Sequence, residues 1–300
     1  MKRALILLNP SAGTGKAGLN ALKIINRFAL EGYEPVVFPI IPSHGLVSEN
    51  ILPDYEGKTE LVFCSGGDGT LNHVVQGVME MQERPILAYI PTGSTNDFAR
   101  GLNIPFEFEK ALDTVFTGNL FRYDVGKFND RYFNYVAAFG AFSDISYATD
   151  QNLKNIFGHA AYIFNAIGEL TNNLQTNYCL RIETDDFAEE GDYLFGAICS
   201  AISIGGFSLF RESDVKLNDG KMELLLVKVP DNPAELPNIA NALLRGTFDH
   251  PCISFRQVSS VRFHAENSIP WSLDGEYGGT WQDTAIEVQQ EAIGIMCNRN

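Results

Sequence analysis

Apolar and polar positions alternate in the first third of the chain in a way that predicts strands and helices in turn. Three apolar runs are short and continuous, as expected for strands buried on both faces of a parallel sheet: 4–8, 61–64 and 86–90. Each run is followed by a polar loop that contains glycine, and then by apolar residues at helical spacing. A further helix is predicted over 107–116. The alternation predicts an α/β domain with a parallel sheet over residues 1–124.

The pattern becomes rich in strands beyond residue 124. Tyr123–Phe128 and Tyr132–Phe139 flank Asn129-Asp130 and predict a hairpin. Further strands are predicted at 178–183, 193–204, 222–229, 260–264 and 285–288. Helices are predicted over 152–170 and from the segment 230–237 to Gly246. These elements predict a larger antiparallel, sandwich-like β domain over residues 125–288.

Composition favours an intracellular protein of two domains. The 300 residues, 45% of them hydrophobic, can bury the cores of about two domains. Five widely spaced cysteines match neither a zinc pattern nor a disulfide framework, which favours a reducing compartment: Cys64, Cys179, Cys199, Cys252 and Cys297. No stretch approaches the roughly 18 apolar residues of a membrane helix. We therefore expect a cytoplasmic protein.

The formal net charge of -15 disfavours nucleic acid as a partner. The same charge disfavours an anionic bilayer, so membrane contact would need a local patch. Candidates for such a patch are Lys16, Lys23, Lys154 and the apolar residues of the predicted 152–170 helix. The alternative for this helix is ordinary packing within the second domain.

The loop after the second apolar run places an acid between glycines, in Gly66-Gly67-Asp68-Gly69-Thr70-Leu71-Asn72. Glycines let a ligand approach the main chain, and the following helix offers unpaired N–H groups with a partial positive charge. Such a loop suits phosphate. Because Asp68 would repel a bare phosphate, its presence favours a divalent cation, or a proton in transit, between the two. A turn with a capping aspartate is the alternative for this loop alone.

Two further loops occupy equivalent positions after the first and third runs. Asn9-Pro10-Ser11-Ala12-Gly13-Thr14-Gly15-Lys16 is not a P-loop, because that pattern requires glycine where Pro10 stands and serine or threonine where Ala17 stands. Its main-chain N–H groups, Ser11 and Lys16 can still hold phosphate. The third loop is Pro91-Thr92-Gly93-Ser94-Thr95-Asn96-Asp97, in which Thr95 or Asn96 could alternatively cap a helix. Three such loops predict one crevice at the carboxyl ends of parallel strands.

The three loops resemble the nucleotide-binding motifs of the diacylglycerol kinase catalytic domain family, in its soluble bacterial lipid kinase branch. The likeness continues at Leu217-Asn218-Asp219-Gly220 and at Leu273-Asp274-Gly275-Glu276-Tyr277, so it spans nearly the whole chain in order. Gly-Gly-Asp-Gly alone also occurs in NAD kinases and phosphofructokinases, whereas the five segments together are specific. The resemblance implies the two-domain arrangement above, with residues 289–300 returning to the first domain and the active site in the cleft between the domains.

The resemblance implies an ATP- and Mg²⁺-dependent kinase that phosphorylates a lipid hydroxyl, and diacylglycerol is the expected acceptor. The expected nucleotide contacts are Asn9, Pro10, Ser11, Ala12, Gly13, Gly66, Gly67, Asp68, Gly69, Thr70, Leu71, Asn72, Ser94 and Asn96. The expected catalytic carboxylates are Glu276 as proton acceptor, Asp274 as a support that could contact metal, Asp68 as metal contact, and Asp97. On an extended strand Asp274 and Glu276 would face one side, but Gly275 makes a tight turn equally possible.

A second cation site is implied by the resemblance at the segment 216–221. By sequence alone this segment is a hairpin turn into the strand at 222. In the family, the aspartate before the glycine binds a structural magnesium together with two main-chain carbonyls. Carried over, the ligands are the Lys216 carbonyl, the Asp219 carboxylate and the Lys221 carbonyl. Oxygen ligands of this kind suit a hard cation.

Several alternatives stay open at the level of sequence. The acceptor could be a sphingoid base, a monoacylglycerol or another lipid alcohol presented at a membrane surface, or NAD, and the chain could be a non-catalytic nucleotide or lipid sensor. A homodimer is possible. The family often has a threonine at the position of Ile41 that touches the nucleotide. Its absence leaves the choice between ATP and another triphosphate open.

Overall fold

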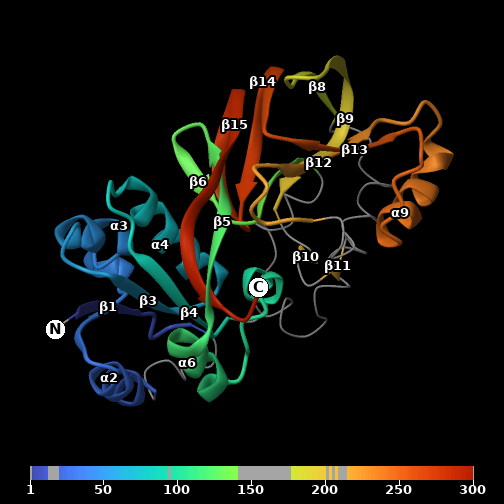
Figure 1. Cartoon of the computed structure of the whole chain (residues 1–300). Helices are drawn as coiled ribbons and strands as arrows, with labels where there is room; N and C mark the ends of the chain where they lie inside the picture. Colours follow the sequence, from blue (N-terminus) through green and yellow to red (C-terminus); the bar gives the residue numbers. More distant parts are fainter. Residues whose placement is uncertain are drawn as a thin grey trace. The chain divides into compact units, whose positions relative to one another are not determined.

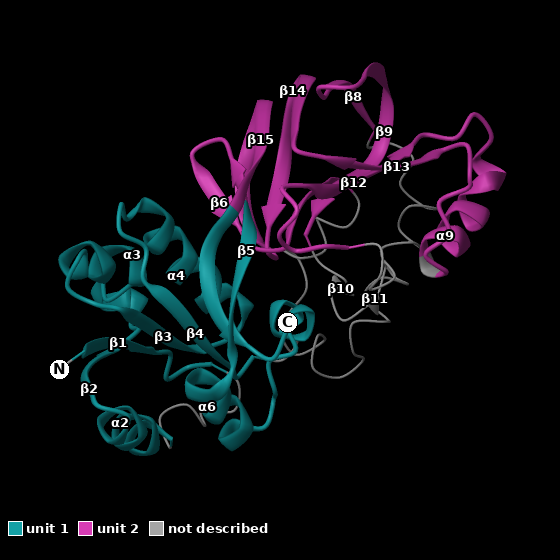
Figure 2. Ribbon diagram, viewed as in Figure 1, with its two compact units in different colours: residues 1–125, 291–300 teal, residues 126–290 magenta. Residues whose placement is uncertain are grey.

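The computed structural model describes residues 2–12, 20–93, 96–140, 177–200, 203–204, 207–208 and 215–299 (Figure 1). The chain divides into two compact units, of which unit 1 comprises Met1–Val125 with Glu291–Asn300 and unit 2 comprises Gly126–Gln290 (Figure 2). The predicted 152–170 helix lies outside the described residues. Gly13, Lys16 and Ser94 also lie outside them.

Unit 1 contains a parallel sheet in the strand order β2-β1-β3-β4. The strands are β1 (Lys2–Leu8), β2 (Tyr33–Pro39), β3 (Leu61–Gly66) and β4 (Ile86–Pro91). The last part of β15 (Glu276–Cys297) is added beside β4, where Ile295 pairs with Leu87 in parallel. Every residue of β3 is buried, as the continuous apolar run predicted. The α/β character predicted for this part of the chain is therefore present.

Helices of unit 1 follow the strands as predicted. They are α2 (Ala21–Leu30), α4 (Asp68–Glu80), α5 (Asp97–Gly101) and α6 (Phe108–Thr117). However, α2 buries Ile24 and Phe28, whereas Leu22, which the apolar spacing placed on its inner face, is exposed. Three short segments between β2 and β3 had no clear sequence signal: η1 (Pro42–His44), α3 (Ser48–Ile51) and η2 (Leu52–Tyr55). Ile24 and Phe28 of α2 and Leu112 of α6 belong to one apolar core with β1, β3 and β4. This core holds the strand ends, and hence the loops, in fixed register.

The described residues of unit 2 lie mostly in antiparallel strands. They are β5 (Asn119–Phe128, which begins in unit 1), β6 (Arg131–Phe133), β7 (Val136–Gly140), β8 (Tyr178–Glu183), β9 (Ala188–Cys199), β12 (Met222–Lys228), β13 (Ile253–Val258), β14 (Ser260–Leu273) and the first part of β15. The described part of unit 2 also contains a short strand pair, β10 (Ser203–Ile204) and β11 (Phe207–Ser208), and the helical η3 (Pro233–Glu235) and α9 (Leu236–Leu244).

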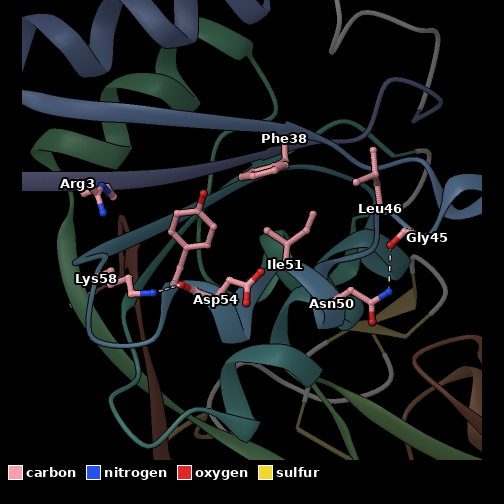
Figure 3. Close-up of a pocket in the computed structure, with 9 residues that line it drawn as sticks. Arg3, Phe38, Gly45, Leu46, Asn50, Ile51, Asp54 and Lys58 are labelled. Atoms are coloured by element: carbon pink, nitrogen blue, oxygen red, sulfur yellow. Dashed lines mark hydrogen bonds between the residues drawn. The ribbon is translucent and has the colours of Figure 1, made fainter.

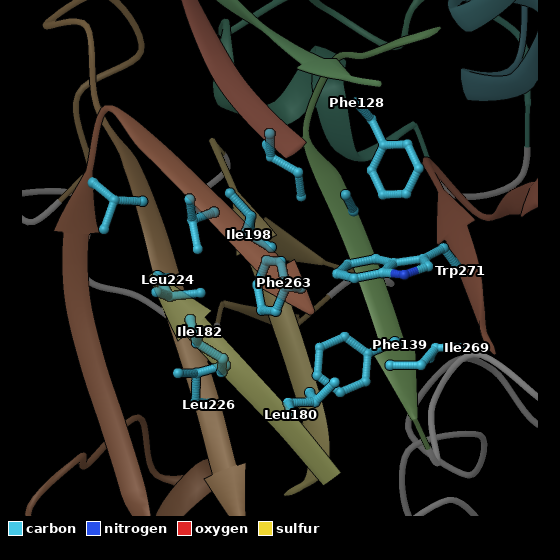
Figure 4. Packing of buried hydrophobic residues seen from close by; sticks show 14 of the residues in the cluster. Phe128, Phe139, Leu180, Ile182, Ile198, Leu224, Leu226, Phe263, Ile269 and Trp271 are labelled. Atoms are coloured by element: carbon cyan, nitrogen blue, oxygen red, sulfur yellow. The ribbon is translucent and has the colours of Figure 1, made fainter. Parts of the chain in front are cut away.

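The sheet of unit 2 folds back on itself, because β7 and β8 each pair with both β9 and β14 along different halves of those long strands. The side chains turned inward form one core (Figure 4). At its centre Trp271 is fully buried, with ring centroids 4.8 Å from Phe139, 5.1 Å from Phe128 and 5.2 Å from Phe263. The rings pack edge to face. Apart from β10 and β11, the described strands of unit 2 belong to one continuous sheet, so the antiparallel character is present while the sandwich-like arrangement stays a prediction.

Four strand predictions were wrong in extent. The predicted strand 193–204 begins earlier, at Ala188, and ends at Cys199. The predicted segments 260–264 and 285–288 are parts of the much longer β14 and β15, whose polar and glycine residues obscure the alternation. The predicted strand Tyr132–Phe139 is divided into β6 and β7, because the N–H groups of residues 134–136 bond to a carboxylate rather than to a neighbouring strand.

Candidate functional site

The glycine-containing loops of unit 1 lie at one edge of its sheet. Leu8, at the end of β1, is paired with Ser65 of β3, and Gly66, at the end of β3, is paired with Pro91 of β4. The Thr92 N–H donates to the Gly66 carbonyl at 2.8 Å. The register of the parallel strands therefore brings the three loops together, as the sequence predicted for a crevice at the carboxyl edge.

Asn9 joins the first loop to the second. Its Nδ2 donates to Oγ1 of Thr70 at 2.8 Å, while its Oδ1 accepts the Ser11 N–H at 2.9 Å. Gly66 lies directly against Thr70, because a Cβ built on Gly66 would collide with the threonine side chain. Ser11 and its neighbour Pro10 are exposed. These predicted contacts thus share one small region of unit 1.

The second and third loops touch through their glycines. A Cβ built on Gly93 would lie 2.7 Å from the Cα of Gly67, a distance that real Cβ atoms do not adopt. A Cβ on Gly67 would lie 3.3 Å from the Cα of Gly93. The two main chains therefore approach as closely as they do only because neither residue carries a side chain.

Asn96 closes the third loop on itself. It is buried and has a left-handed backbone, with φ of 54°. Its Oδ1 accepts the Gly93 N–H at 3.0 Å, and its Nδ2 donates to the Gly93 carbonyl at 2.8 Å. These bonds give the Asn96 side chain a structural role in the loop. Its contact with nucleotide stays a prediction.

Tyr89 of β4 supports the same region, and the sequence reasoning missed it. Its hydroxyl donates to the Gly66 carbonyl at 3.1 Å and lies 3.4 Å from Oδ1 of Asn96. Burial and the nearby Asp68 carboxylate raise the pKa of the phenol well above its usual value, so it stays a neutral donor. The available signal was a tyrosine within an otherwise aliphatic buried strand.

The two predicted acids of unit 1 meet where these loops end. Asp68 is the first residue of α4, and its Oδ2 accepts the Asp97 N–H at 3.2 Å. Asp97 is the first residue of α5 and is 3% exposed. A carboxylate in the first turn of α4 is favoured by the partial positive charge there. The arrangement supports Asp68 as an organiser of the site.

The remainder of the second motif lies in α4, and His73 follows directly after it. Leu71 and Asn72 are buried in the helix. His73 is exposed and forms an ion pair with Glu49 of α3 when protonated. His73 therefore belongs to a surface contact between α4 and α3.

A separate cavity of 470 Å³ lies in unit 1 between β2 and the segment from α3 to η2 (Figure 3). Its lining residues are Arg3, Phe38, Gly45, Leu46, Asn50, Ile51, Asp54, Tyr55 and Lys58. None of the described residues predicted to contact nucleotide lines this cavity. Ile41, where the family often has threonine, is bridged to Leu46 at its border. The cavity is therefore distinct from the glycine loops.

In unit 2, Asp274 and Gly275 form a two-residue hairpin turn between β14 and β15. Leu273 pairs with Glu276, and the φ angles of the two turn residues are 50° and 85°. Positive φ at both positions is the condition of a type I′ turn, for which Asp-Gly is a preferred pair. The sequence left open an extended strand or a turn here, and the structure contains the turn. Glu276 is exposed at its end.

The carboxylate of Asp274 is buried and accepts three consecutive main-chain N–H groups. Its Oδ2 accepts from Asn134 at 2.7 Å, and its Oδ1 accepts from Tyr135 and Val136 at 3.0 Å each. The Asp274 N–H donates back to the Val136 carbonyl at 2.8 Å. These bonds support Asp274 as a structural support of the turn. Its contact with metal stays a prediction.

The sequence reasoning also missed the partners of Asp274. The sequence predicts one continuous strand over Tyr132–Phe139, because Tyr135 and Val136 fit the strand pattern. Only the tertiary structure reveals that their N–H groups turn toward the 273–276 hairpin, which lies some 140 residues away in sequence. The pattern of side-chain types does not indicate hydrogen bonds that main-chain N–H groups make to a residue about 140 positions away.

The predicted metal turn has a compact geometry. Oδ1 of Asp219 accepts the Lys221 N–H at 3.1 Å, and Gly220 has φ of 75°. Asp219 is half-buried, whereas Lys216 and Lys221 are exposed. Among the described residues, no group of three or more histidines, cysteines and acids could hold a metal. The predicted set needs only one carboxylate with main-chain oxygens, a hard donor set that Mg²⁺ accepts.

Two further observations concern the whole described chain. All five cysteines are free, and Cys64, Cys199 and Cys297 are buried. Within the described ranges, no helix is long and apolar enough to cross a membrane.

Residues 3–128 match the family model of the diacylglycerol kinase catalytic domain. The chain is 32% identical over 293 residues to a diacylglycerol kinase of Staphylococcus carnosus, covering 96% of this chain and 93% of that one. It is 33% identical over 285 residues to a diacylglycerol kinase of Bacillus subtilis, covering 93% and 91%. The fold resembles a crystal structure of a diacylglycerol kinase from Bacillus anthracis, with a TM-score of 0.75, 20% identity and coverage of 99% and 97%.

Replacing Gly93 should weaken nucleotide binding. In Gly93→Ala the new methyl group forces the second and third loops apart, and we expect ATP affinity to fall by about 10-fold, or about 1.4 kcal/mol. Titration calorimetry measures this change. Gly191→Ala is the matched control, because its Cβ meets atoms only at 3.7 Å and beyond. Equal affinities for Gly93→Ala and wild type would contradict a nucleotide site at these loops.

Replacing Asp274 should destabilise unit 2. In Asp274→Asn, one of the two accepting oxygens becomes an NH₂ group, which cannot accept the main-chain N–H that faces it. We therefore expect the free energy of unfolding to fall by about 2–3 kcal/mol. Urea denaturation followed by circular dichroism measures this loss. Asp186→Asn, at an exposed residue of the same unit, is the control. A loss no larger than that of the control would show that the three N–H bonds contribute little.

Proposed function

The chain belongs to the diacylglycerol kinase family and is a kinase with an alcohol acceptor, and from this premise we propose that it transfers the γ-phosphoryl group of ATP to diacylglycerol. The product would be phosphatidic acid. The curated relatives carry the name diacylglycerol kinase and share about a third of their residues with this chain over nearly its whole length. These relatives are named for diacylglycerol, and we propose the same acceptor for this chain.

The observation that carries the proposal is the meeting of the three loops in unit 1. Phosphoryl transfer depends on positioning the phosphates and on stabilising charge, rather than on covalent chemistry by the protein. The contact of Gly67 with Gly93 exposes main chain to a ligand, and the Asn9–Thr70 bond fixes the first loop against it. These features support a phosphate site formed by the described residues of the three loops.

Asp68 would hold the magnesium ion that accompanies the triphosphate, directly or through water. The carboxylate lies in the first turn of α4 and bonds to the Asp97 N–H, so its orientation is fixed. A bound Mg²⁺ would neutralise charge that develops on the transferred group. The turn at Asp219 would hold a second, structural Mg²⁺ with the carbonyls of Lys216 and Lys221.

Glu276 would take the proton from the acceptor hydroxyl. A base must lie within hydrogen-bond reach of the proton it removes, and the Asp274-Gly275 turn sets where Glu276 begins. Its exposed side chain is open to a second substrate. Asp274, whose oxygens accept main-chain N–H groups, would position the base rather than share its chemistry.

The acceptor would be presented at a lipid surface, with which the chain makes peripheral contact. Lys23, one candidate for that contact, lies in α2 and pairs with Glu109 at 2.6 Å. Lys16, Lys154 and the 152–170 segment lie outside the described residues. A lipid partner is therefore supported by the family and by the nature of the proposed substrate.

Transfer from labelled ATP to diacylglycerol in mixed micelles with Mg²⁺ tests the proposal. We expect wild-type protein to form phosphatidic acid, and Asp68→Ala and Glu276→Ala each to reduce turnover by about 100-fold or more. Glu287→Ala, at an exposed position of β15, is the control and should retain full activity.

Other outcomes of this assay identify the alternatives. Transfer to a sphingoid base or monoacylglycerol, but not to diacylglycerol, would correct the acceptor alone. Transfer to NAD and to no lipid would overturn a lipid kinase. Nucleotide binding without transfer to any acceptor would indicate a sensor.

A further inference from the structure

Residues 131–136 form hydrogen bonds with the segment Asp274–Tyr277 at both of its ends. Residues 134–136 bind the Asp274 carboxylate, as described above. Arg131, three residues earlier in β6, donates from Nη1 to the Tyr277 carbonyl at 2.9 Å. Tyr277 directly follows Glu276. The proposed base therefore lies between two anchored residues, and both anchors come from residues 131–136.

The ladder between β14 and β15 is interrupted immediately beyond Tyr277. Ser272 pairs with Tyr277 and Trp271 pairs with Gly279, so Gly278 is an extra residue in β15. Such a bulge leaves main-chain groups without their regular partners in the ladder. The Arg131 guanidinium supplies a bond to the carbonyl next to this interruption. A charged donor makes a stronger bond than a neutral one.

The side chain of Glu276 depends on this main-chain support. It is exposed, and among the described residues no hydrogen bond or ion pair orients its carboxylate. Its position is therefore set mainly by the peptide units on either side. The Asp274 bonds fix the unit before it, and the Arg131 bond fixes the carbonyl of the residue after it.

We propose that Arg131 is a positioning residue for the base. By holding the Tyr277 carbonyl, it keeps the strand from shifting at the bulge and keeps the Glu276 carboxylate where the acceptor hydroxyl must arrive. The inference rests on the proposed function, in which Glu276 is the base. Displacement of a reacting group by about 1 Å can cost about 100-fold in rate, so a single main-chain bond can matter here.

The test compares Arg131→Met with Arg131→Lys under the micelle assay. We expect kcat of Arg131→Met to fall by about 10-fold to 100-fold while KM for ATP stays within about 2-fold. Lysine, or added guanidinium ion at millimolar concentration, should restore part of kcat, because either supplies a cationic donor to the same carbonyl. Arg262→Met, at an exposed arginine of β14, is the matched control and should behave as wild type.

A second measurement does not depend on turnover. Hydrogen exchange of the peptide 273–281 should become faster in Arg131→Met and stay unchanged in Arg262→Met. Wild-type exchange in Arg131→Met, or a kcat within about 2-fold of wild type, would overturn this inference alone. A loss of kcat that neither lysine nor guanidinium restores would assign Arg131 to folding. A wild-type chain that transfers no phosphate would overturn the proposed function together with the inference.

Discussion

The arrangement of unit 2 around the proposed base, Glu276, depends on the hydrogen bonds that the buried Asp274 carboxylate accepts. Three N–H groups and one carboxylate satisfy each other away from water, so removing either side leaves buried polar groups without partners. The left-handed backbone at Asp274 has a small cost, which these bonds offset, whereas Gly275 adopts its positive φ freely. The same bonds also separate β6 from β7 along the chain. A local turn and a distant strand break thus have one physical cause, and together they determine where Glu276 begins.

Unit 1 depends on a different constraint, the close approach between the main chains of its second and third loops. Gly67 and Gly93 touch because neither has a side chain, and the loop containing Gly93 is closed by the amide of Asn96. Tyr89 stays neutral beneath them because burial and the Asp68 charge raise its pKa. Phosphate recognition by such a surface uses N–H groups rather than side chains. In the proposed function, Asp68 would contribute what those groups cannot, a ligand for a cation.

The sequence predicted those parts of the fold that depend on local periodicity. The buried run of β3 and the apolar face of α4 were readable because one period determines each element. The lengths of β14 and β15 were not, because the pairing of these strands shifts register between His264 and Ile269 and again at Gly278, and each shift breaks the alternation. The motif residues could be found from their types, but their partners could not. Asn134 and Arg131 each form a bond between a main-chain group and a side chain about 140 positions apart, and side-chain patterns do not record such bonds.

In the proposed reaction, the glycine loops bind the phosphates, and Glu276, placed by the Asp274-Gly275 turn, accepts the proton. Nucleotide binding and phosphoryl transfer should therefore be separable by substitution. Glu276→Gln keeps the size of the side chain and removes only its ability to accept a proton. The most direct measurement combines calorimetric titration of this variant with Mg²⁺-ATP and single-turnover transfer to diacylglycerol. The account predicts nucleotide affinity within about 2-fold of wild type and transfer slower by about 100-fold or more. Transfer at the wild-type rate, or a loss of transfer explained entirely by weaker nucleotide binding, would contradict it.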